Sequence, residues 1–415
     1  MRETYNLEFK QTMTNSFLKT VVAFANYDGG KIIFGLDDEA NIIGIENPTK
    51  FAIDLENKIN DSINPQVSYE IEIDQNYLVI LNVESGDDKP YFYKSKSYKR
   101  NDSATVEVDN QELKRLILEG KNISYDQVPS TYKDYKFSYL EGKLQEQLGI
   151  DKLNNDILKT LELIDKNNEL TNAGDIFSDR NSRNMIDIVR FGDDINTILS
   201  RFTYKDMSIL KAFDLALDKY KEYYNIEKID GMYRRKIELI PEPAFREAIA
   251  NALVHRDWMI HSFIQISLTE EGIRIISPGS LTQGISEEEY INGNLSLMRN
   301  PIIANIFFRL DIIEAFGTGI RRIKKAYEDE VVKPEFKVYQ NSIEVFLPVI
   351  EKSLDLSIDE NKVIEALINK KLSSSQLGEI TGFKKNKLID LLNSLIEKSV
   401  VVREGKNRGT KYKLR

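Results

Sequence analysis

The stretch SFLKTVVAFANYDGGKIIFGL, residues 16–36, decides the fold of the N-terminal part of the chain. Its first half repeats apolar residues at helical spacing, and the glycines of YDGG then predict a turn into the buried strand KIIFGL. Further strands are predicted at 41–45, 69–73 and 77–83, and a further helix at 51–61. Mixed helices and strands in this order indicate an α+β domain over residues 1–120.

The rest of the chain divides into three segments. Residues 121–154 are polar and rich in Tyr, which predicts a connector that wraps on a surface. Residues 155–350 mix strand and helix signals, with the predicted helix AFREAIANALVHRDW at 244–258 and a predicted hairpin at 263–279. Residues 351–415 form a separate basic segment. The fold class we expect is therefore α+β and multidomain.

The composition excludes several classes of protein. The chain has 415 residues, 41% of them hydrophobic, with two His and no Cys. Without Cys there can be no disulfide scaffold, Cys-ligated zinc, iron–sulfur cluster or thiol nucleophile. No apolar run approaches the roughly 18 residues of a membrane span, and the first residues lack a signal core. We expect a cytoplasmic protein without a membrane partner.

Charge is distributed unevenly along the chain. The net charge is −9, whereas residues 361–415 hold ten Lys and three Arg against five acidic residues. A basic segment on an acidic body indicates local contact with a polyanion, because a local patch sets the field that a partner meets. A solvated, Lys-rich surface is the alternative.

Four acidic residues near the N-terminus form a candidate metal site. Glu3, Glu8, Asp37 and Asp38 lie in segments that approach each other if the N-terminal strand packs beside KIIFGL. Three converging carboxylates can hold Mg²⁺ or Mn²⁺, which prefer oxygen ligands. Glu3 and Glu8 would, however, point to opposite faces of a regular strand. Surface acids remain the alternative.

The segment YFYKSKSYKR, residues 91–100, interleaves Tyr with basic residues. Basic groups neutralise phosphates and Tyr rings stack on unpaired bases, a combination suited to RNA or single strands. The alternative is an edge strand protected by Lys. The candidate nucleic-acid contacts are Lys94, Lys96, Lys99 and Arg100.

The predicted helix at 244–258 carries a second constellation. Glu247, Asn251 and His255 are spaced by four residues and therefore share one helix face. Glu and Asn on one face could serve as general base and Mg²⁺ ligand beside a nucleotide triphosphate, and an ordinary polar face is the alternative. Two glycine-containing turns follow, SPGSL at 277–281 and FGTGI at 316–320.

The C-terminal segment predicts three helices, at 361–371, 373–382 and 384–400, followed by a two-stranded wing. This order is typical of a winged helix. Lys384, Lys385 and Lys387 open the third helix, where they fit major-groove DNA contact, and Arg408 lies on the wing within reach of phosphates. Docking of protein or RNA is the alternative.

The first segment carries the motifs RETYNLEFK and LKTVVAFANYDGGKIIFGLDDEANIIGI, followed by YKRNDSATVEVDNQEL at 98–113. Over about residues 1–120 it resembles the Schlafen AlbA-type domain. In Schlafen nucleases, two Glu and one Asp form a metal-dependent endoribonuclease centre. The resemblance places these catalytic and metal-binding positions on Glu3, Glu8 and Asp38, although many bacterial members are described only as nucleic-acid-binding or regulatory proteins.

The middle segment carries the motifs FREAIANALVHRDW, IRIISPGSL and MRNPIIANIFFRLDIIEAFGTGIRRI. Over residues 155–350 it resembles a divergent GHKL-type ATPase domain, an α/β sandwich. It implies Glu247 as the catalytic acid, Asn251 as the Mg²⁺ ligand, and Gly279, Gly317 and Gly319 in the glycine turns near the nucleotide. The family's Asp that contacts adenine is absent, since the chain reads Ile276-Ser277-Pro278-Gly279. ATP, GTP and other anionic ligands all stay open.

Two functions follow as hypotheses. The first is a nucleic-acid-binding protein with a candidate metal-dependent endoribonuclease centre for structured, tRNA-like RNA, acting in phage defence, regulated by a nucleotide-like ligand and with weak ATPase activity. The second is a transcriptional regulator that binds duplex DNA through its winged helix, senses a ligand and does not catalyse. The sequence leaves homo-oligomerisation open.

Overall fold

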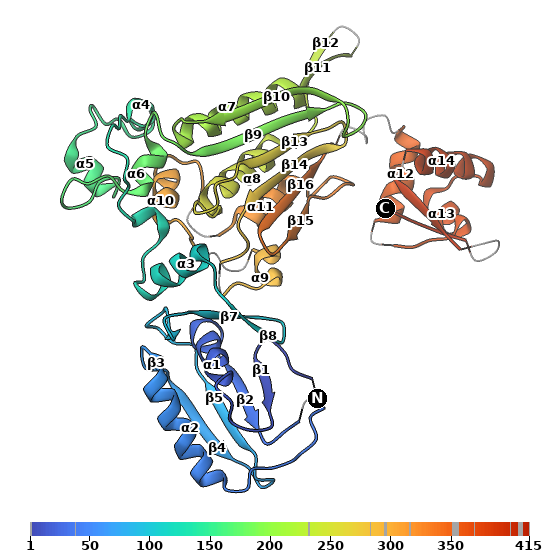
Figure 1. Cartoon of the computed structure of the whole chain (residues 1–415). Coiled ribbons are helices and arrows are strands. Elements are labelled where there is room, and N and C mark those ends of the chain that lie inside the picture. Colours follow the sequence, from blue (N-terminus) through green and yellow to red (C-terminus); the bar gives the residue numbers. More distant parts are fainter. Residues whose placement is uncertain are drawn as a thin grey trace. The chain divides into compact units, whose positions relative to one another are not determined.

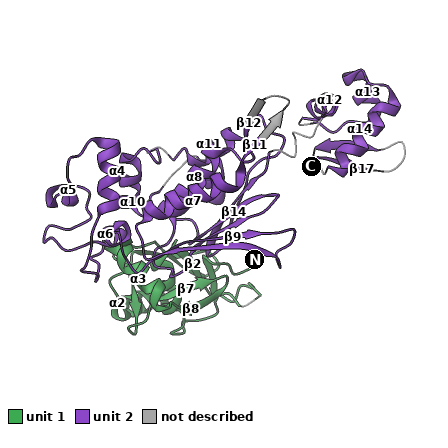
Figure 2. Ribbon diagram, turned by 90° about the horizontal axis from the view of Figure 1, so that it is seen from above, with its two compact units in different colours: residues 1–125 green, residues 126–415 purple. Residues whose placement is uncertain are grey.

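The computed structural model describes residues 2–37, 39–230, 233–282, 284–293, 297–314, 317–350, 357–368, 370–398, 400–405 and 410–414. The chain forms two compact units, Met1–Tyr125 and Asp126–Arg415 (Figure 2). Both mix helices and strands, so the protein is α+β and multidomain, as expected (Figure 1). Within the described residues, no helix has the length and apolar character needed to cross a membrane.

The first unit is built on a four-stranded sheet in the order β1-β2-β5-β4. The strands are β1 (Leu7–Lys10), β2 (Gly30–Phe34), β4 (Tyr69–Ile73) and β5 (Val79–Val83). β1 pairs with β2 in parallel, and the other two pairings are antiparallel. β1 is therefore an edge strand, and the side chains at alternate positions of it share one face.

Helix α1 (Phe17–Asn26) fills the core of this unit. Every residue except Lys19 is buried, because the helix contacts β5 of the sheet and also β6 (Phe92–Tyr93), β7 (Tyr98–Asn101) and β8 (Ala104–Glu107). Its last residue, Asn26, donates to Tyr91 O and Ser97 Oγ and accepts from Tyr91 N at 2.8 Å. This amide fixes the 91–97 segment to the helix.

The remaining elements of this unit are α2 (Pro48–Ser62), β3 (Ile63–Asn64), which pairs with β6, and α3 (Asn110–Gly120). The predicted strand at 41–45 is wrong. Ile42 forms only an isolated bridge with Leu36, while the backbone nitrogens of Ile43 and Gly44 both donate to Gly35 O. Gly44 takes a φ of 76°, a left-handed conformation that ends regular pairing.

The second unit is organised around a six-stranded sheet in the order β10-β9-β13-β14-β16-β15. The strands are β9 (Asn184–Phe191), β10 (Ile198–Lys205), β13 (Ile264–Leu268), β14 (Gly272–Pro278), β15 (Glu335–Val338) and β16 (Ser342–Pro348). β9 and β13 pair in parallel and the other pairs are antiparallel. β13 and β14 form the hairpin that the sequence predicts.

Helices cover one side of this sheet (Figures 1 and 2). α7 (Ile209–Tyr224) contacts β9, and α8 (Glu242–His255) contacts β14 and β16. α10 (Pro301–Arg309) and α11 (Gly319–Ala326) both contact α8. α8 therefore lies at the centre of the layer, buried by the sheet beneath it and by helices beside it.

Shorter elements complete the second unit. They are the 3₁₀ turn Tyr125–Gln127, α4 (Ser138–Leu148), α5 (Asn155–Thr160), α6 (Asn172–Phe177), β11 (Asn225–Asp230), β12 (Tyr233–Glu238) and α9 (Glu287–Asn292). The residues expected to form a connector thus include a regular helix, α4. Its Leu140 and Leu144 are buried, one turn apart on the same face.

The C-terminal segment has three helices, α12 (Ile358–Leu367), α13 (Ser374–Thr381) and α14 (Lys385–Glu397), then β17 (Val401–Glu404) paired with β18 (Lys411–Leu414). Ser373 and Gln376 form a capping box at the start of α13, and Gly382 ends it in a left-handed conformation. These are the elements expected from the sequence, and the assignment to winged helices stays a prediction.

Candidate functional site

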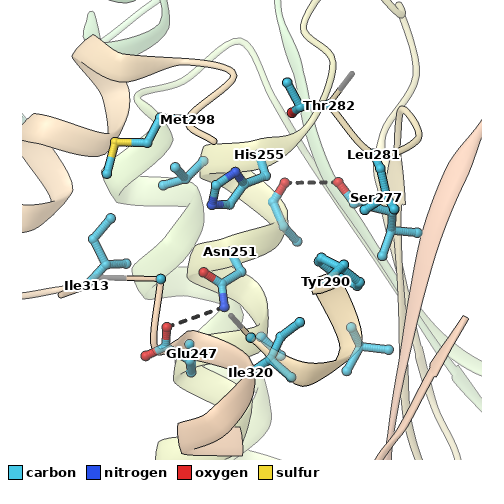
Figure 3. Close-up of a pocket in the computed structure, with 18 of the residues that line it drawn as sticks. Glu247, Asn251, His255, Ser277, Leu281, Thr282, Tyr290, Met298, Ile313 and Ile320 are labelled. Atoms are coloured by element: carbon cyan, nitrogen blue, oxygen red, sulfur yellow. Dashed lines mark hydrogen bonds between the residues drawn. The ribbon is translucent and has the colours of Figure 1, made fainter. Parts of the chain in front are cut away.

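Helix α8 carries three polar side chains along one face. Glu247, Asn251 and His255 lie in a row along it because residues four apart fall on the same side of a helix (Figure 3). All three line one cavity of the second unit. The structure thus brings the predicted constellation together in one pocket.

Glu247 and Asn251 interact directly. Asn251 Nδ2 donates to Glu247 Oε1 at 3.3 Å, and Glu247 is only 7% exposed. Burial raises the pKa of the Glu247 carboxyl, and Arg322 and the Asn251 bond offset part of this effect. A carboxyl with a raised pKa exchanges protons nearer neutral pH, as a general base requires. Asn251 uses its nitrogen for this bond, so Oδ1 is the atom that could ligate Mg²⁺.

Gly317 and Gly319 bring the start of α11 against these two side chains. A Cβ at Gly319 would overlap Asn251 Nδ2 and would lie 2.5 Å from Glu247 Oε1. Gly317 has a φ of 63°, a left-handed conformation that most side chains avoid. A side chain at position 319 would displace the ends of Glu247 and Asn251, so glycine lets α11 begin this close to α8 without moving them.

The cavity has an empty volume of about 1060 Å³, which includes its solvent-filled mouth. Beyond the polar face of α8, its walls are largely apolar (Figure 3). The apolar lining includes Ile275, Leu281, Met298, Ile320, Ile343 and Val345. A cavity with apolar walls and a few convergent polar groups is the usual form of a small-molecule site.

His255 and Ser277 supply polar groups near the end of α8. Ser277 Oγ donates to Ala252 O at 3.0 Å, which ties β14 to the last turn of this helix. Burial and the charge of Arg299 lower the pKa of His255 to about 4. The imidazole is therefore neutral near pH 7, with one donor and one acceptor nitrogen.

Gly279 has a different structural role from Gly317 and Gly319. It is not among the described residues that line the cavity. Its φ is 101°, and a Cβ there would lie 2.6 Å from Asp257 Cβ. Gly279 therefore allows the end of β14 to approach the residues that follow α8, and its neighbour Ser280 faces the cavity instead.

Sequence reasoning missed Asn300, which does not line the cavity but holds the C-terminal end of α8. Asn300 is fully buried, and its Nδ2 donates to Val254 O at 2.7 Å and Arg256 O at 3.0 Å. Next to it, the backbone nitrogens of Ile302 and Ile303 donate to the buried carboxylate of Asp126. The Asn-Pro pair at the start of a helix was the available signal.

In the first unit, Glu8 is the centre of a buried charged cluster. Its carboxylate pairs with Arg100, accepts from Thr20 Oγ1 at 2.8 Å, and lies 2.8 Å from Lys10 Nζ. Glu8 and Lys10 are two residues apart on β1 and share a face. Sequence reasoning did not identify Lys10 or Thr20.

Glu3 lies before β1 and makes a separate contact with this strand. Its Oε1 accepts from Phe9 N at 2.8 Å. Asn6 O and Lys10 O accept bonds from the β2 side, so Phe9 N faces the free edge of β1 and Glu3 satisfies it. Asp38 lies outside the described residues, and Asp37 uses its carboxylate to bind Asn41 and the Glu39 nitrogen. Among the residues described, no three acidic or His side chains form a metal-binding group.

The basic stretch at 91–100 is arranged differently from the expectation. Tyr91, Tyr93 and Tyr98 are 3%, 6% and 6% exposed, so these rings belong to the core and the predicted base stacking on them is wrong. Arg100 is directed into the Glu8 cluster, with its side chain 6% exposed. Among the other predicted contacts, Lys94 and Lys96 are exposed, Lys99 is partly buried, and Lys96 pairs with Glu107 at 2.6 Å.

The predicted DNA contacts of the C-terminal segment lie at the start of α14. Lys384, Lys385 and Lys387 are exposed there. Lys387 pairs with Asp359 at 2.6 Å, which reduces its positive charge toward a partner. Arg408 lies outside the described residues.

Two parts of the chain match known protein families. Residues 3–109 match the Schlafen, AlbA_2 family. Residues 261–347 match the HATPase_c_4 family, described as "Putative ATP-dependent DNA helicase recG C-terminal". These matches confirm the resemblance to a Schlafen AlbA-type domain and, within residues 261–347, the resemblance to an ATPase-type domain. Helix α8 precedes the second match.

Individual proteins resemble this chain either over a short part of it or at low sequence identity. An "Uncharacterized ATP-binding protein" of Ureaplasma parvum serovar 3 is 37% identical over 78 residues, which span 17% of this chain and 22% of that relative. The crystal structure of the DIP2311 protein from Corynebacterium diphtheriae is similar with a TM-score of 0.50 and 17% identity, over 99% of this chain and 92% of that one. This likeness concerns the α+β fold alone.

Proposed function

We propose that the second unit binds a nucleoside triphosphate together with Mg²⁺ in the α8 cavity. The observation that carries this proposal is the close approach of Gly319, the first residue of α11, to Glu247 and Asn251, which leaves no room for a Cβ. A helix thus begins beside a carboxylate and an amide, and the free backbone N–H groups at a helix start favour phosphate. Mg²⁺ would neutralise phosphate charge beside Asn251, and Glu247 would accept a proton from an attacking water, so any ATPase activity depends on Glu247.

A thermal-shift measurement tests this proposal. Mg²⁺ and a non-hydrolysable ATP analogue at 100 times its dissociation constant would stabilise the native protein by about 2.7 kcal/mol. Asn251→Ala should abolish the rise in melting temperature. Asn305→Ala is the matched control, because Asn305 is an exposed helical Asn outside the cavity lining. The absence of binding by any nucleoside triphosphate would contradict the proposal.

For the first unit we propose nucleic-acid binding and, more finely, metal-dependent cleavage of structured RNA such as tRNA by Glu3, Glu8 and Asp38, in phage defence. The Schlafen match and the buried carboxylate of Glu8 support it. Both oxygens of Glu8 already have partners, so Lys10 would have to release Oε1 for a metal ion to bind. The fit to a metal is therefore incomplete in this arrangement.

Incubation of the full-length protein with total tRNA and Mn²⁺, with and without EDTA, tests the cleavage proposal. Glu8→Gln should abolish cleavage, while Glu70→Gln, a change at an exposed strand position, should not. Equal cleavage by both variants would contradict the assignment of Glu8. No cleavage by the wild type would favour the second function, a ligand-sensing DNA-binding regulator, which the exposed lysines at the start of α14 support.

A further inference from the structure

A second cavity of the same unit adjoins the first one at Glu247. Glu247, Ile313 and Glu314 line both cavities, so the two meet at these side chains. Glu247 stands at the end of its row on α8 that is away from His255 (Figure 3). The second cavity has an empty volume of about 1040 Å³, which includes its open mouth, and is formed by the first turns of α8, the segment after α10, and α11. It therefore borders the phosphate end of the proposed nucleotide site.

Three basic side chains line this second cavity. Arg246 comes from α8, while Arg322 and Lys325 lie three residues apart on α11 and so share one face of that helix. The described residues that line the first cavity, in contrast, include no Lys or Arg. Positive charge near the phosphate end is thus concentrated in the second cavity.

The three cations differ in their present partners. Arg246 Nη2 donates to the backbone oxygen of Asp311 at 2.6 Å, a neutral partner that leaves the positive charge of Arg246 uncompensated. Arg322 pairs with Glu314, which an incoming anion would have to displace or share. The Lys325 ammonium forms no hydrogen bond or ion pair with any residue that the structure describes. Lys325 is therefore the cation that an anion can engage without breaking an existing contact.

The geometry of hydrolysis connects Glu247 to this second cavity. The attacking water lies in line with the leaving oxygen, on the side of the γ-phosphorus away from ADP. The water oxygen bonds to this phosphorus, the bridging oxygen leaves with its electron pair on ADP, and the water proton passes to Glu247. Because Glu247 lines both cavities, inorganic phosphate forms at the boundary with the second one.

We propose that the second cavity binds this inorganic phosphate through Arg246, Arg322 and Lys325. The inference rests on the proposed nucleotide binding and adds a separate site and exit route for the product. Phosphate makes stronger hydrogen bonds to charged donors than to neutral ones, so three cations favour its transfer out of the first cavity. The phosphate then leaves by the second mouth, before ADP is released.

Titration calorimetry of the full-length protein with inorganic phosphate tests the site, first without nucleotide and then with saturating Mg²⁺ and ADP. The wild type should bind phosphate in both conditions. Lys325→Gln should weaken this binding by at least about three-fold, because a charge-assisted contact is lost, and Lys325→Arg should restore it. Lys324→Gln is the matched control, since Lys324 is the neighbouring exposed lysine of α11 but donates to Ile291 O and does not line the second cavity.

The outcomes separate this inference from the proposed function. No phosphate binding by the wild type, loss of that binding when ADP is added, or wild-type affinity in Lys325→Gln would overturn the second site and leave nucleotide binding intact. Phosphate binding that depends on Lys325, without binding of ADP or the ATP analogue, would contradict the proposed function and retain the anion site. Failure of the wild type to bind either ligand would overturn both. Lys325 is exposed, so its replacement leaves the packing of the unit unchanged.

Discussion

Desolvation of the half-buried His255 predicts a measurable pH dependence of stability. Its pKa is about 4 in the folded protein and 6.5 as the ordinary value. Between these two values the unfolded chain binds a proton that the folded protein does not bind. Stability from this residue is therefore complete above pH 6.5, falls as the pH is lowered, and is fully lost below pH 4.

The size of the effect follows from the two pKa values. One pKa unit corresponds to about 1.4 kcal/mol, so the complete loss is about 3 kcal/mol. Between pH 7.5 and pH 5.0 the same linkage gives a loss of about 2 kcal/mol. For a unit of this size, such a loss lowers the melting temperature by roughly 4–8 °C.

The assay is differential scanning calorimetry of the wild type and His255→Gln at both pH values. The wild type should lose about 2 kcal/mol more than the variant on acidification, because all other titrating groups are common to both proteins. His261→Gln is the matched control, since His261 is the other His of the chain and is exposed. A difference between wild type and His255→Gln that is the same at both pH values would refute the reasoning.

Three further predictions concern other sites. Gly319→Ala should lower the free energy of unfolding by about 1–3 kcal/mol through overpacking and should abolish binding of the ATP analogue, both measured by melting. Gly142→Ala is the control, because no atom lies within 4 Å of its added Cβ, and it should change neither stability nor binding. Asp126→Ala should cost about 1–3 kcal/mol, because two backbone N–H groups of α10 lose their buried acceptor, and urea denaturation measures the loss. Joint replacement of Lys384, Lys385 and Lys387 by Gln should weaken the salt dependence of duplex DNA binding. The slope of the log binding constant against the log salt concentration should become shallower by about 0.9 for each phosphate that is no longer neutralised. An unchanged slope would show that these lysines do not contact DNA.

Several elements of this protein could be predicted from local sequence patterns. The helix at 17–26, the strand after it, and the shared face of Glu247, Asn251 and His255 all follow from spacing within a few residues. The capping box of Ser373 and Gln376 is equally local. Such features are readable because helix and strand periods are fixed by backbone geometry. The missing strand at 41–45 shows the limit, since a glycine in a left-handed conformation interrupted an otherwise suitable pattern.

Only the tertiary structure decided which distant groups meet. Glu8 pairs with Arg100, 92 positions away, which turned a predicted phosphate contact into a buried ion pair. Asp126 caps α10 across 176 positions. The tyrosines at 91–98 are in the core because α1 requires cover on the side away from the sheet. The cavity formed where β14 and α11 approached the polar face of α8. Contacts of this kind depend on the packing of whole elements, and periodicity within one element carries no information about them.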